Sequence, residues 1–329
     1  MIGNVCAGVR TPQWAALGLG LLACIAARPV LAADCPGHPD ALGTSRTLVV
    51  DPREHPRIGT MQYPETLPLR DHEVVLTFDD GPLPRNSNQV LDILASQCVK
   101  ATYFLVGQMA RAYPWVVRRM YNDGHTIGTH SLDHPLGFER LPLPRVEHEV
   151  EGGIASVDAA IGDPKAVSPF FRIPGLGRSH VDENFLASQH LVTWSADVVA
   201  DDWFRGISAQ QIVQRAMRRL DAKGRGILLL HDIHPATAMA LPTLLKELKE
   251  GGYHVVQVVP AGERPASVPV LVAAGDKGAW PRVLKTSATV HRATAHHKTA
   301  LRHHIKKLYA KKRHPAAVAS IPERRQERF

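Results

Sequence analysis

Apolar runs alternate with amphipathic segments between residues 73 and 260 of this 329-residue chain. Compact apolar runs predict strands at 74–78, 101–106, 125–128, 170–173, 191–195, 226–230 and 253–259. Helical spacing predicts helices between them, at 90–98, 109–122, 146–161, 184–189, 209–222 and 241–250. Strands that alternate with helices indicate a parallel sheet, and about seven such units favour a closed or nearly closed barrel over an open sheet.

The N-terminus has the layout of a secretory signal. Arg10 precedes an almost wholly apolar stretch at 14–27, and small residues follow at 30–33. The stretch is short for a membrane span, which needs roughly 20 apolar residues. We therefore expect a signal peptide at 1–33 and an exported protein, periplasmic or extracellular, with an uncleaved membrane anchor as the alternative. Residues 34–72 are rich in Pro, Asp, Arg and His and predict an irregular lead-in.

Cleavage near Ala33 would leave two cysteines, Cys35 and Cys98. An oxidising compartment favours a disulfide between them. The alternative is that Cys98 is a small buried apolar residue just before a strand. The sequence leaves both interpretations open.

The net charge of +8 is concentrated at the C-terminus. Residues 285–329 carry twelve Lys or Arg against two Glu, so residues 1–284 hold a net charge of −2. We expect 261–329 to be a linker and a basic, His-rich, disordered tail. The segment 285–329 would either contact an anionic envelope polymer or membrane surface, or remain solvated without a partner. We expect no specific nucleic-acid partner, and the sequence indicates no oligomeric state.

Polar side chains follow the apolar runs at the ends of successive predicted strands. In a β/α barrel these carboxyl ends form the active-site face. The residues collected there are Asp79, Asp80, His130, His134, Arg172, Asp197, Asp201, Asp202, Trp203 and His231. Asp79 and Asp80 are adjacent, and strand alternation predicts that they point to opposite sides. A nearby cation would relieve their mutual repulsion by binding one and leaving the other as a base.

The segment His130-Ser-Leu-Asp-His134 spaces two histidines at i and i+4, which on a helical turn would place both imidazoles on one side. Two histidines and one carboxylate leave open positions for water and substrate, as catalytic zinc requires. By itself the spacing also fits two surface or capping histidines. The same donor set serves ferrous oxygenases, but those favour all-β scaffolds.

Five motifs in order resemble the polysaccharide deacetylases with a NodB homology domain, carbohydrate esterase family 4. They are TFDDGP, HSLDH, FRIPG, the acidic run ending in DDW, and LLLH, and they span roughly residues 70–260. The resemblance implies a distorted (β/α)7 barrel at 73–260 and metal-dependent removal of acetyl groups from a sugar polymer. Neither the lead-in nor the tail is covered.

The resemblance also implies roles, each assigned by motif position. Asp79 resembles the general base and His231 the general acid. The metal ligands would be Asp80, His130 and His134, usually for zinc, with cobalt or nickel as alternatives. Arg172 resembles the residue that holds the base, and Asp202 the acid that tunes the histidine. Trp203 and Leu229 resemble walls of the acetyl-methyl pocket, while Pro174 and Gly175 border the groove.

Two positions depart from the family pattern. The third motif usually ends in Tyr after Pro, whereas here Gly175 follows Pro174. Gly175 keeps the backbone N–H expected to face the oxyanion, but the groove loses an aromatic wall. The fourth motif usually reads Asp-x-x-Asp-Trp, and here Val199 stands in place of the first Asp. Which of Asp197, Asp201 and Asp202 supports His231 or Arg172 is therefore left open.

The function expected from this resemblance is removal of N-acetyl groups from an N-acetylglucosamine-containing glycan: peptidoglycan, a chitin-like oligomer or an exopolysaccharide. O-Deacetylation remains an alternative reaction. Two other classes stay open: a metal-dependent C–N hydrolase of a small amide or imide, and a non-catalytic carbohydrate-binding relative. A pocket too closed for a sugar chain would favour the former, and loss of a metal ligand the latter.

Overall fold

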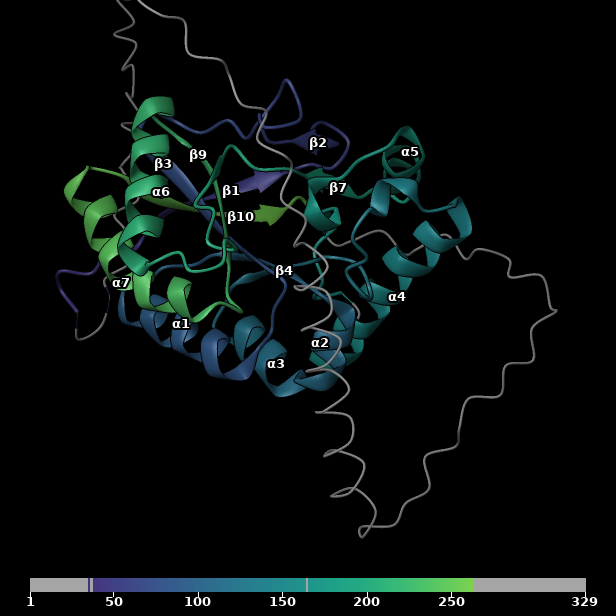
Figure 1. The fold of residues 1–329 in the computed structure, drawn as a ribbon, viewed down its shortest axis with the longest axis horizontal. Coiled ribbons are helices and arrows are strands. Elements are labelled where there is room, and N and C mark those ends of the chain that lie inside the picture. Colours follow the sequence, from purple (N-terminus) through teal and green to yellow (C-terminus); the bar gives the residue numbers. More distant parts are fainter. Residues whose placement is uncertain (1–34, 36–37, 164, 263–329) are drawn as a thin grey trace, which may run out of the picture. The chain divides into compact units, whose positions relative to one another are not determined.

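The fold is an α/β arrangement in which a parallel sheet is surrounded by helices (Figure 1). The computed structural model describes residue 35, residues 38–163 and residues 165–262. The strands are β1 (Thr44–Val50), β2 (Arg57–Ile58), β3 (Glu73–Asp79), β4 (Thr102–Leu105), β5 (Thr126–Thr129), β6 (Phe170–Phe171), β7 (Val192–Trp194), β8 (Val198–Val199), β9 (Gly226–His231) and β10 (His254–Pro260). The helices are α1 (Pro84–Ser96), α2 (Gly107–Ala112), α3 (Pro114–Asn122), α4 (Leu143–Ile161), α5 (His180–Ser188), α6 (Ala209–Lys223) and α7 (Pro235–Glu250), with 3-10 turns at Phe138–Arg140 and Pro174–Leu176.

The strands pair in the order expected of a β/α barrel. Parallel ladders run from β9 through β3, β4, β5 and β6 to β7. β8 follows β7 in the chain and pairs back to β9. Among the described residues no ladder joins β7 to β9. Between β7 and β8 the ring of strands is therefore continued by the chain itself, at residues 195–197, and not by strand hydrogen bonds. This confirms the predicted fold class and brings the carboxyl ends of the strands to one face.

Apolar residues fill both sides of the strands. β3 is buried along its whole length, as parallel strands covered on both faces are. Val74, Leu76 and Phe78 pack outward against the helices, while Val75 joins an inner cluster with Phe104 and Trp194. This alternation gives the barrel two cores, one inside the ring of strands and one beneath the helices.

The helix boundaries follow local signals. Ser208 and Gln211 form a capping box at the start of α6, and Gly224 ends that helix in a left-handed conformation. The predicted single helix at 109–122 is wrong. It is divided into α2 and α3 at Tyr113, because Pro114 lacks an amide hydrogen and disfavours helical geometry in the residue before it.

The lead-in contains more regular structure than its composition indicated. β1 pairs in parallel with β10, and β2 pairs with β7. The Asp197 carboxylate accepts hydrogen bonds from the Thr60 amide at 2.7 Å and from the Thr66 hydroxyl at 2.6 Å. Cys35 and Cys98 form a disulfide, which answers the question that the sequence left open. The lead-in is thus attached to the barrel along its length.

The predicted signal peptide at 1–33 and basic tail at 285–329 lie outside the described residues. Within the described part of the chain, no helix has the length and apolarity needed to cross a bilayer.

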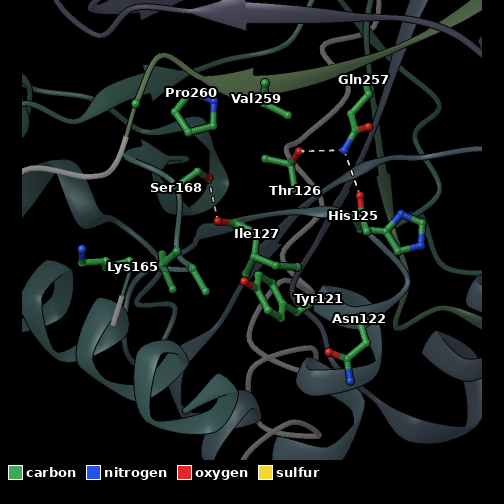
Figure 2. Close-up of a pocket in the computed structure, with 14 residues that line it drawn as sticks. Tyr121, Asn122, His125, Thr126, Ile127, Lys165, Ser168, Gln257, Val259 and Pro260 are labelled. Atoms are coloured by element: carbon green, nitrogen blue, oxygen red, sulfur yellow. Dashed lines mark hydrogen bonds between the residues drawn. The ribbon is translucent and has the colours of Figure 1, made fainter. Parts of the chain in front are cut away.

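A cavity of about 510 Å³ opens beside α3, β5 and β10 (Figure 2). Its lining includes Thr126 at the amino end of β5 and Pro260 at the end of β10. His125 is part of this lining, and its Nδ1 accepts the Ala101 amide at 3.1 Å. Burial lowers the pKa of His125 to about 3, so the ring is neutral and its role here is structural. None of the sequence-predicted site residues lines this cavity.

Candidate functional site

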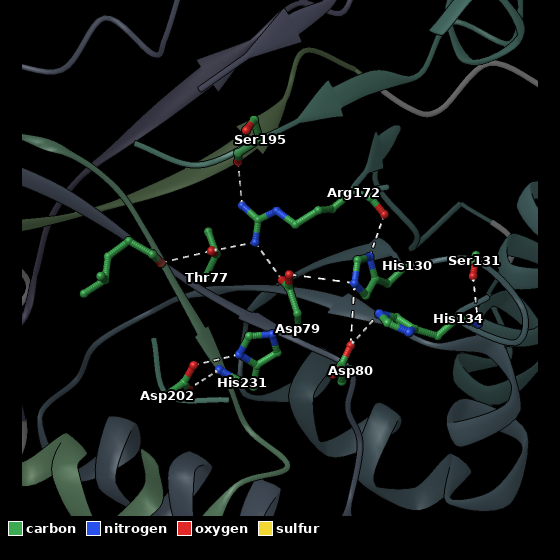
Figure 3. Close-up of polar contacts among 11 residues, drawn as sticks. Thr77, Asp79, Asp80, His130, Ser131, His134, Arg172, Ser195, Asp202 and His231 are labelled. Atoms are coloured by element: carbon green, nitrogen blue, oxygen red, sulfur yellow. Dashed lines mark hydrogen bonds and ion pairs between the residues drawn. The ribbon is translucent and has the colours of Figure 1, made fainter. Parts of the chain in front are cut away.

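The two adjacent carboxylates reach the same site, contrary to the strand alternation. β3 ends at Asp79, and Asp80 adopts a left-handed conformation with φ of 74°. Aspartate tolerates this region better than most residues. The His130 Nε2 atom lies 3.8 Å from Asp79 Oδ2 and 3.5 Å from Asp80 Oδ1 (Figure 3). The sharp turn at Asp80 therefore brings both side chains to the carboxyl end of the barrel.

The histidine pair is close together in space but not on a helix. Residues 130–134 form an irregular loop, in which Ser131 and His134 have φ of 65° and 53°. The predicted helical turn is therefore wrong, although the two rings still meet, with centroids 4.8 Å apart. Backbone hydrogen bonds hold the loop in place, including one from the Gly107 amide to the Ser131 carbonyl at 2.9 Å.

Asp80, His130 and His134 form a group suited to one metal ion. One donor atom from each residue lies within 4.8 Å of the other two. Asp80 Oδ1 is 3.5 Å from His130 Nε2 and 3.3 Å from His134 Nε2. A tetrahedral ion with bonds of ~2.0–2.1 Å separates its ligands by roughly 3.3 Å, close to these values.

The chemistry of the donors fits a cation as well. His130 Nδ1 must donate to the Arg172 carbonyl oxygen, 2.6 Å away, because a carbonyl only accepts. This leaves the lone pair of Nε2 directed at the site, an arrangement typical of metal-binding histidines. Burial lowers the pKa of His130 to about 4, so the ring is neutral at pH 7. Asp80 Oδ1 is buried and has no hydrogen-bond donor among the described residues.

Arg172 binds one carboxylate oxygen of Asp79. Its Nη1 donates to Asp79 Oδ1 at 2.6 Å and to the Thr77 hydroxyl at 2.8 Å, and its Nη2 donates to the Ser195 carbonyl at 2.9 Å. The guanidinium also lies over the Phe104 ring, 4.2 Å from its centroid. Four contacts fix the cation, so Asp79 is held in one orientation with Oδ2 on the side of His130.

His231, at the end of β9, is oriented by Asp202. His231 Nδ1 lies 2.7 Å from Asp202 Oδ1, and Asp202 Oδ2 accepts the His231 amide at 2.7 Å and the Thr237 hydroxyl at 2.6 Å. Burial disfavours the imidazolium, but Asp202, together with the charges of Asp80 and Asp79, raises the pKa of His231 to about 9. The ring is therefore protonated near neutral pH and can donate a proton from Nε2.

Of the predicted pocket residues, Trp203 has a ring contact with His231. The Trp203 ring is partly buried, with its centroid 5.5 Å from that of His231. Leu229 is buried on β9, two residues before His231. Pro174 is buried, while Gly175 is exposed, with φ of 63° and no atom within 4 Å of an added Cβ. At Gly175, where the family pattern has an aromatic residue, the structure thus has open space and a left-handed backbone conformation.

The three acidic residues of the fourth motif have separate partners. Asp202 supports His231, as described above. Asp201 accepts from Arg215 and Arg219 at 2.9 and 2.8 Å. Asp197 holds the lead-in and accepts the Ile227 amide at 2.8 Å. The sequence left open which of these acids supports His231 or Arg172. In the structure Asp202 supports His231, and Arg172 is paired with Asp79 rather than with any of the three.

Sequence reasoning missed two buried acids next to the site. Glu149 on α4 accepts the amides of Leu132 and Asp133 at 3.1 and 2.9 Å and thereby fixes the histidine loop. The signal was a carboxylate on the apolar face of the predicted helix, next to Val146 and Val150.

Asp232 follows His231 and is fully buried, which raises its pKa to about 7. A Cβ at Gly81 would overlap the Asp232 carboxylate, so glycine is required beside Asp80. Only its position immediately after His231 marked Asp232 in the sequence.

Comparison with known proteins identifies a family and several relatives that this chain resembles. The family model for polysaccharide deacetylase matches residues 67–190. A peptidoglycan-N-acetylglucosamine deacetylase of Bacillus cereus is 30% identical over 200 residues, covering 58% of this chain and 89% of the relative. The PgdA protein of Listeria monocytogenes, with the same described activity, is 33% identical over 188 residues, covering 56% of this chain and 38% of the relative. The chain thus spans about two fifths of that longer relative.

A solved structure has the same fold. The peptidoglycan deacetylase Bd3279 of Bdellovibrio bacteriovorus matches with a TM-score of 0.59 and 31% identity, covering 66% of this chain and 59% of that one. The sequence match over most of the Bacillus cereus relative and this structural match agree with the geometry described above. The chain belongs to the polysaccharide deacetylase family.

Proposed function

We propose that the protein is a metal-dependent hydrolase that removes N-acetyl groups from an N-acetylglucosamine-containing polysaccharide. One observation carries the proposal: Asp80, His130 and His134 converge within 4.8 Å, with the Arg172-held Asp79 and the Asp202-held His231 beside them. The relatives described as peptidoglycan-N-acetylglucosamine deacetylases support the substrate class.

The three donors would hold one divalent ion, with zinc favoured by the two imidazoles and cobalt or nickel as alternatives. When bound, such an ion polarises the acetamide carbonyl and lowers the pKa of a water molecule toward ~7. The remaining steps belong to the chain's own side chains. Asp79 Oδ2 takes the proton from the attacking water, since Oδ1 is occupied by Arg172.

His231 completes the reaction on the other flank. Its Nε2 gives a proton to the leaving amine nitrogen, and Asp202 stabilises the charged ring before the transfer. The backbone N–H of Gly175 supports the oxyanion. Trp203 and Leu229 enclose the acetyl methyl group, so that a larger acyl group is excluded.

Acetate release from purified protein tests the proposal. The protein is stripped with a chelator, reloaded with zinc, cobalt or nickel, and assayed on N-acetylglucosamine oligomers and on peptidoglycan. We expect no release from the stripped protein and recovery on reloading. Equal activity in the stripped and reloaded states would refute the role of the metal.

The same assay separates the alternatives. Release only from small amides or imides would favour the C–N hydrolase class, and release only from O-acetylated sugars would favour an esterase. Binding of glycan without release under any metal would favour a non-catalytic relative. That last class conflicts with the presence of both proton-transfer side chains in the site.

We further propose that the protein is exported. The support is the signal-like N-terminus together with a disulfide between Cys35 and Cys98, a bond typical of oxidising compartments. N-terminal sequencing of protein recovered outside the cytoplasm should begin near Asp34. Recovery of protein that retains residues 1–33 would favour the uncleaved anchor.

The basic segment 285–329 is proposed as an electrostatic tether to anionic envelope polymer or lipid. Truncation after residue 284 should weaken retention on anionic vesicles at low salt and leave acetate release from a soluble oligomer unchanged. Unchanged retention would show that the segment is a solvated tail without this partner.

A further inference from the structure

The turn after Asp202 presents a second aromatic side chain that the proposed chemistry does not use. Phe204 is 50% exposed, and its ring centroid lies 5.5 Å from that of Trp203. Trp203 in turn lies 5.5 Å from the ring of His231. A half-exposed aromatic residue is therefore two ring contacts from the predicted general acid.

The Phe204 ring lies against an arginine side chain that is itself held by an ion pair. The Arg215 guanidinium carbon lies 5.4 Å from its centroid, and Arg215 Nη1 is fixed by Asp201 at 2.9 Å. Arg219 also donates to Asp201, at 2.8 Å, and to the Val199 carbonyl at 2.7 Å. The Asp201 carboxylate, which has no part in the proposed reaction, thus organises a cationic support for this ring.

The backbone of the turn is fixed as well. The Phe204 amide donates to the Asp201 carbonyl at 3.0 Å, and the Ile207 amide donates to the Phe204 carbonyl at 3.2 Å. Because the ring lies against a guanidinium and makes a T-shaped contact with Trp203, it has little freedom to lose on binding a ligand. A preorganised apolar surface of this kind binds with a low entropic cost.

We propose that Phe204 is a stacking platform for a second sugar of the glycan, next to the sugar that loses its acetyl group. The inference rests on the proposed function and deepens it, because it makes the enzyme selective for oligomers over single sugars. The occupant is assigned from continuity: Phe204, Trp203 and His231 form an unbroken row of rings that leads out of the site. The C–H face of a pyranose is apolar and suits an aromatic ring, while its hydroxyl groups remain hydrated.

The test compares acetate release from N-acetylglucosamine oligomers of increasing length. In the zinc-loaded wild type, kcat/KM should rise from the disaccharide to the pentasaccharide. Phe204→Ala should lower kcat/KM for the pentasaccharide by about tenfold, mainly through KM, and the disaccharide by much less. Phe204→Leu should resemble Phe204→Ala because it keeps bulk but lacks a ring, and Phe204→Trp should keep the length dependence.

Trp115→Ala is the matched control, because Trp115 is 54% exposed on α3 and its ring contact is with Tyr113. It should leave all oligomer lengths unaffected. A Phe204→Ala loss that is equal at every length would overturn the inference, since it would mean that Phe204 acts through Trp203 and His231. An unaffected pentasaccharide, or a change in oligomeric state by sedimentation, would also overturn it.

Calorimetry on metal-free protein keeps this inference separate from the proposed reaction. Wild-type protein should bind the pentasaccharide more tightly than the disaccharide, and Phe204→Ala should lose that difference even if no acetate is ever released. Absence of turnover with intact length-dependent binding would refute the reaction and support the platform. Turnover that Phe204→Ala does not affect would support the reaction and refute the platform.

Discussion

Arg172 Nη1 lies 2.6 Å from Asp79 Oδ1, and neither side chain is more than 3% exposed. The counter-charge of this buried carboxylate is therefore at hydrogen-bond distance. The pair also occupies one carboxylate oxygen and leaves the other, Oδ2, toward the histidines. The proton acceptor of the proposed reaction is therefore defined at the level of a single atom.

Asp79→Asn should abolish most deacetylation without loss of metal. The amide is nearly the same shape but cannot take a proton from water, and general base catalysis typically contributes ~10²–10⁴-fold. Acetate release and metal content are measured on the same preparation. His130→Ala is the matched variant, expected to lose both. Near-normal turnover by Asp79→Asn would end the assignment of Asp79 as the base.

Arg172→Met should destabilise the fold strongly. It leaves the Asp79 charge buried without its partner, a change that typically costs ~3–5 kcal/mol. The free energy of unfolding from urea denaturation measures the effect. Adding Asp79→Asn to Arg172→Met should recover part of the loss, because the unpaired charge is then removed. A double variant no more stable than Arg172→Met would contradict this account.

Glu149→Ala should weaken metal binding although the residue is not a proposed ligand. Its carboxylate accepts the amides of Leu132 and Asp133, which precede His134 in the loop. Residues that orient ligands in this way typically affect metal affinity by ~10–100-fold. Titration with a competing zinc chelator gives the affinity. Glu147→Ala, two residues earlier on α4 and only partly buried, is the control and should bind as the wild type does.

Asp202→Asn should move the alkaline limb of the pH–rate profile to lower pH. Asp202 makes the largest contribution of the carboxylates that oppose burial and raise the pKa of His231 to about 9, so the pKa falls without its charge. The general acid then deprotonates earlier as pH rises. The measurement is kcat/KM against pH, with zinc saturating. An unshifted alkaline limb would show that another group supplies the proton.

The same pair links stability to pH. The folded pKa of His231 is above its ordinary value of 6.5, so the pair stabilises the fold fully below pH 6.5. That contribution is lost as the pH rises from 6.5 through about 9. Unfolding free energies measured across this window should fall in the wild type, and Asp202→Asn should show a smaller slope.

Removal of the disulfide should lower stability without altering the chemistry. Cys35 and Cys98 are 63 residues apart, and in the chain-entropy model a loop of that size contributes about 4 kcal/mol. Cys35→Ala with Cys98→Ala should therefore unfold at lower urea while kcat stays the same. Equal unfolding midpoints for this variant and the oxidised wild type would contradict the prediction.

Much of this fold was predictable because each strand and helix carries its own signal. β3, with Val74 to Phe78 buried on both faces, and α6, capped by Ser208 and Gly224, required only local information. β1 and β2 were missed because their strand geometry depends on β10 and β7, which are distant in the chain. Propensity in a half-exposed strand such as β1 is weak, and tertiary pairing decides it.

The site also has a part that the sequence predicted and a part that it did not. Its polar residues were found because parallel strands deliver their ends to one face, as at His231 and Asp79. The path of the backbone between them was not predictable: the i and i+4 histidines imply a helix, but Ser131 adopts a left-handed conformation and the loop depends on Glu149. The partners of Asp197, Asp201 and Asp202 likewise depend on residues brought together only by folding.

The ladder between β1 and β10 has a practical consequence for anyone trimming this protein. The family match begins at residue 67, but a fragment starting there would leave the edge of β10 bare and remove the Cys35 half of the disulfide. An uncovered edge strand is a template for self-association. The smallest well-behaved fragment should therefore begin near Cys35, well before the first residue of the family match.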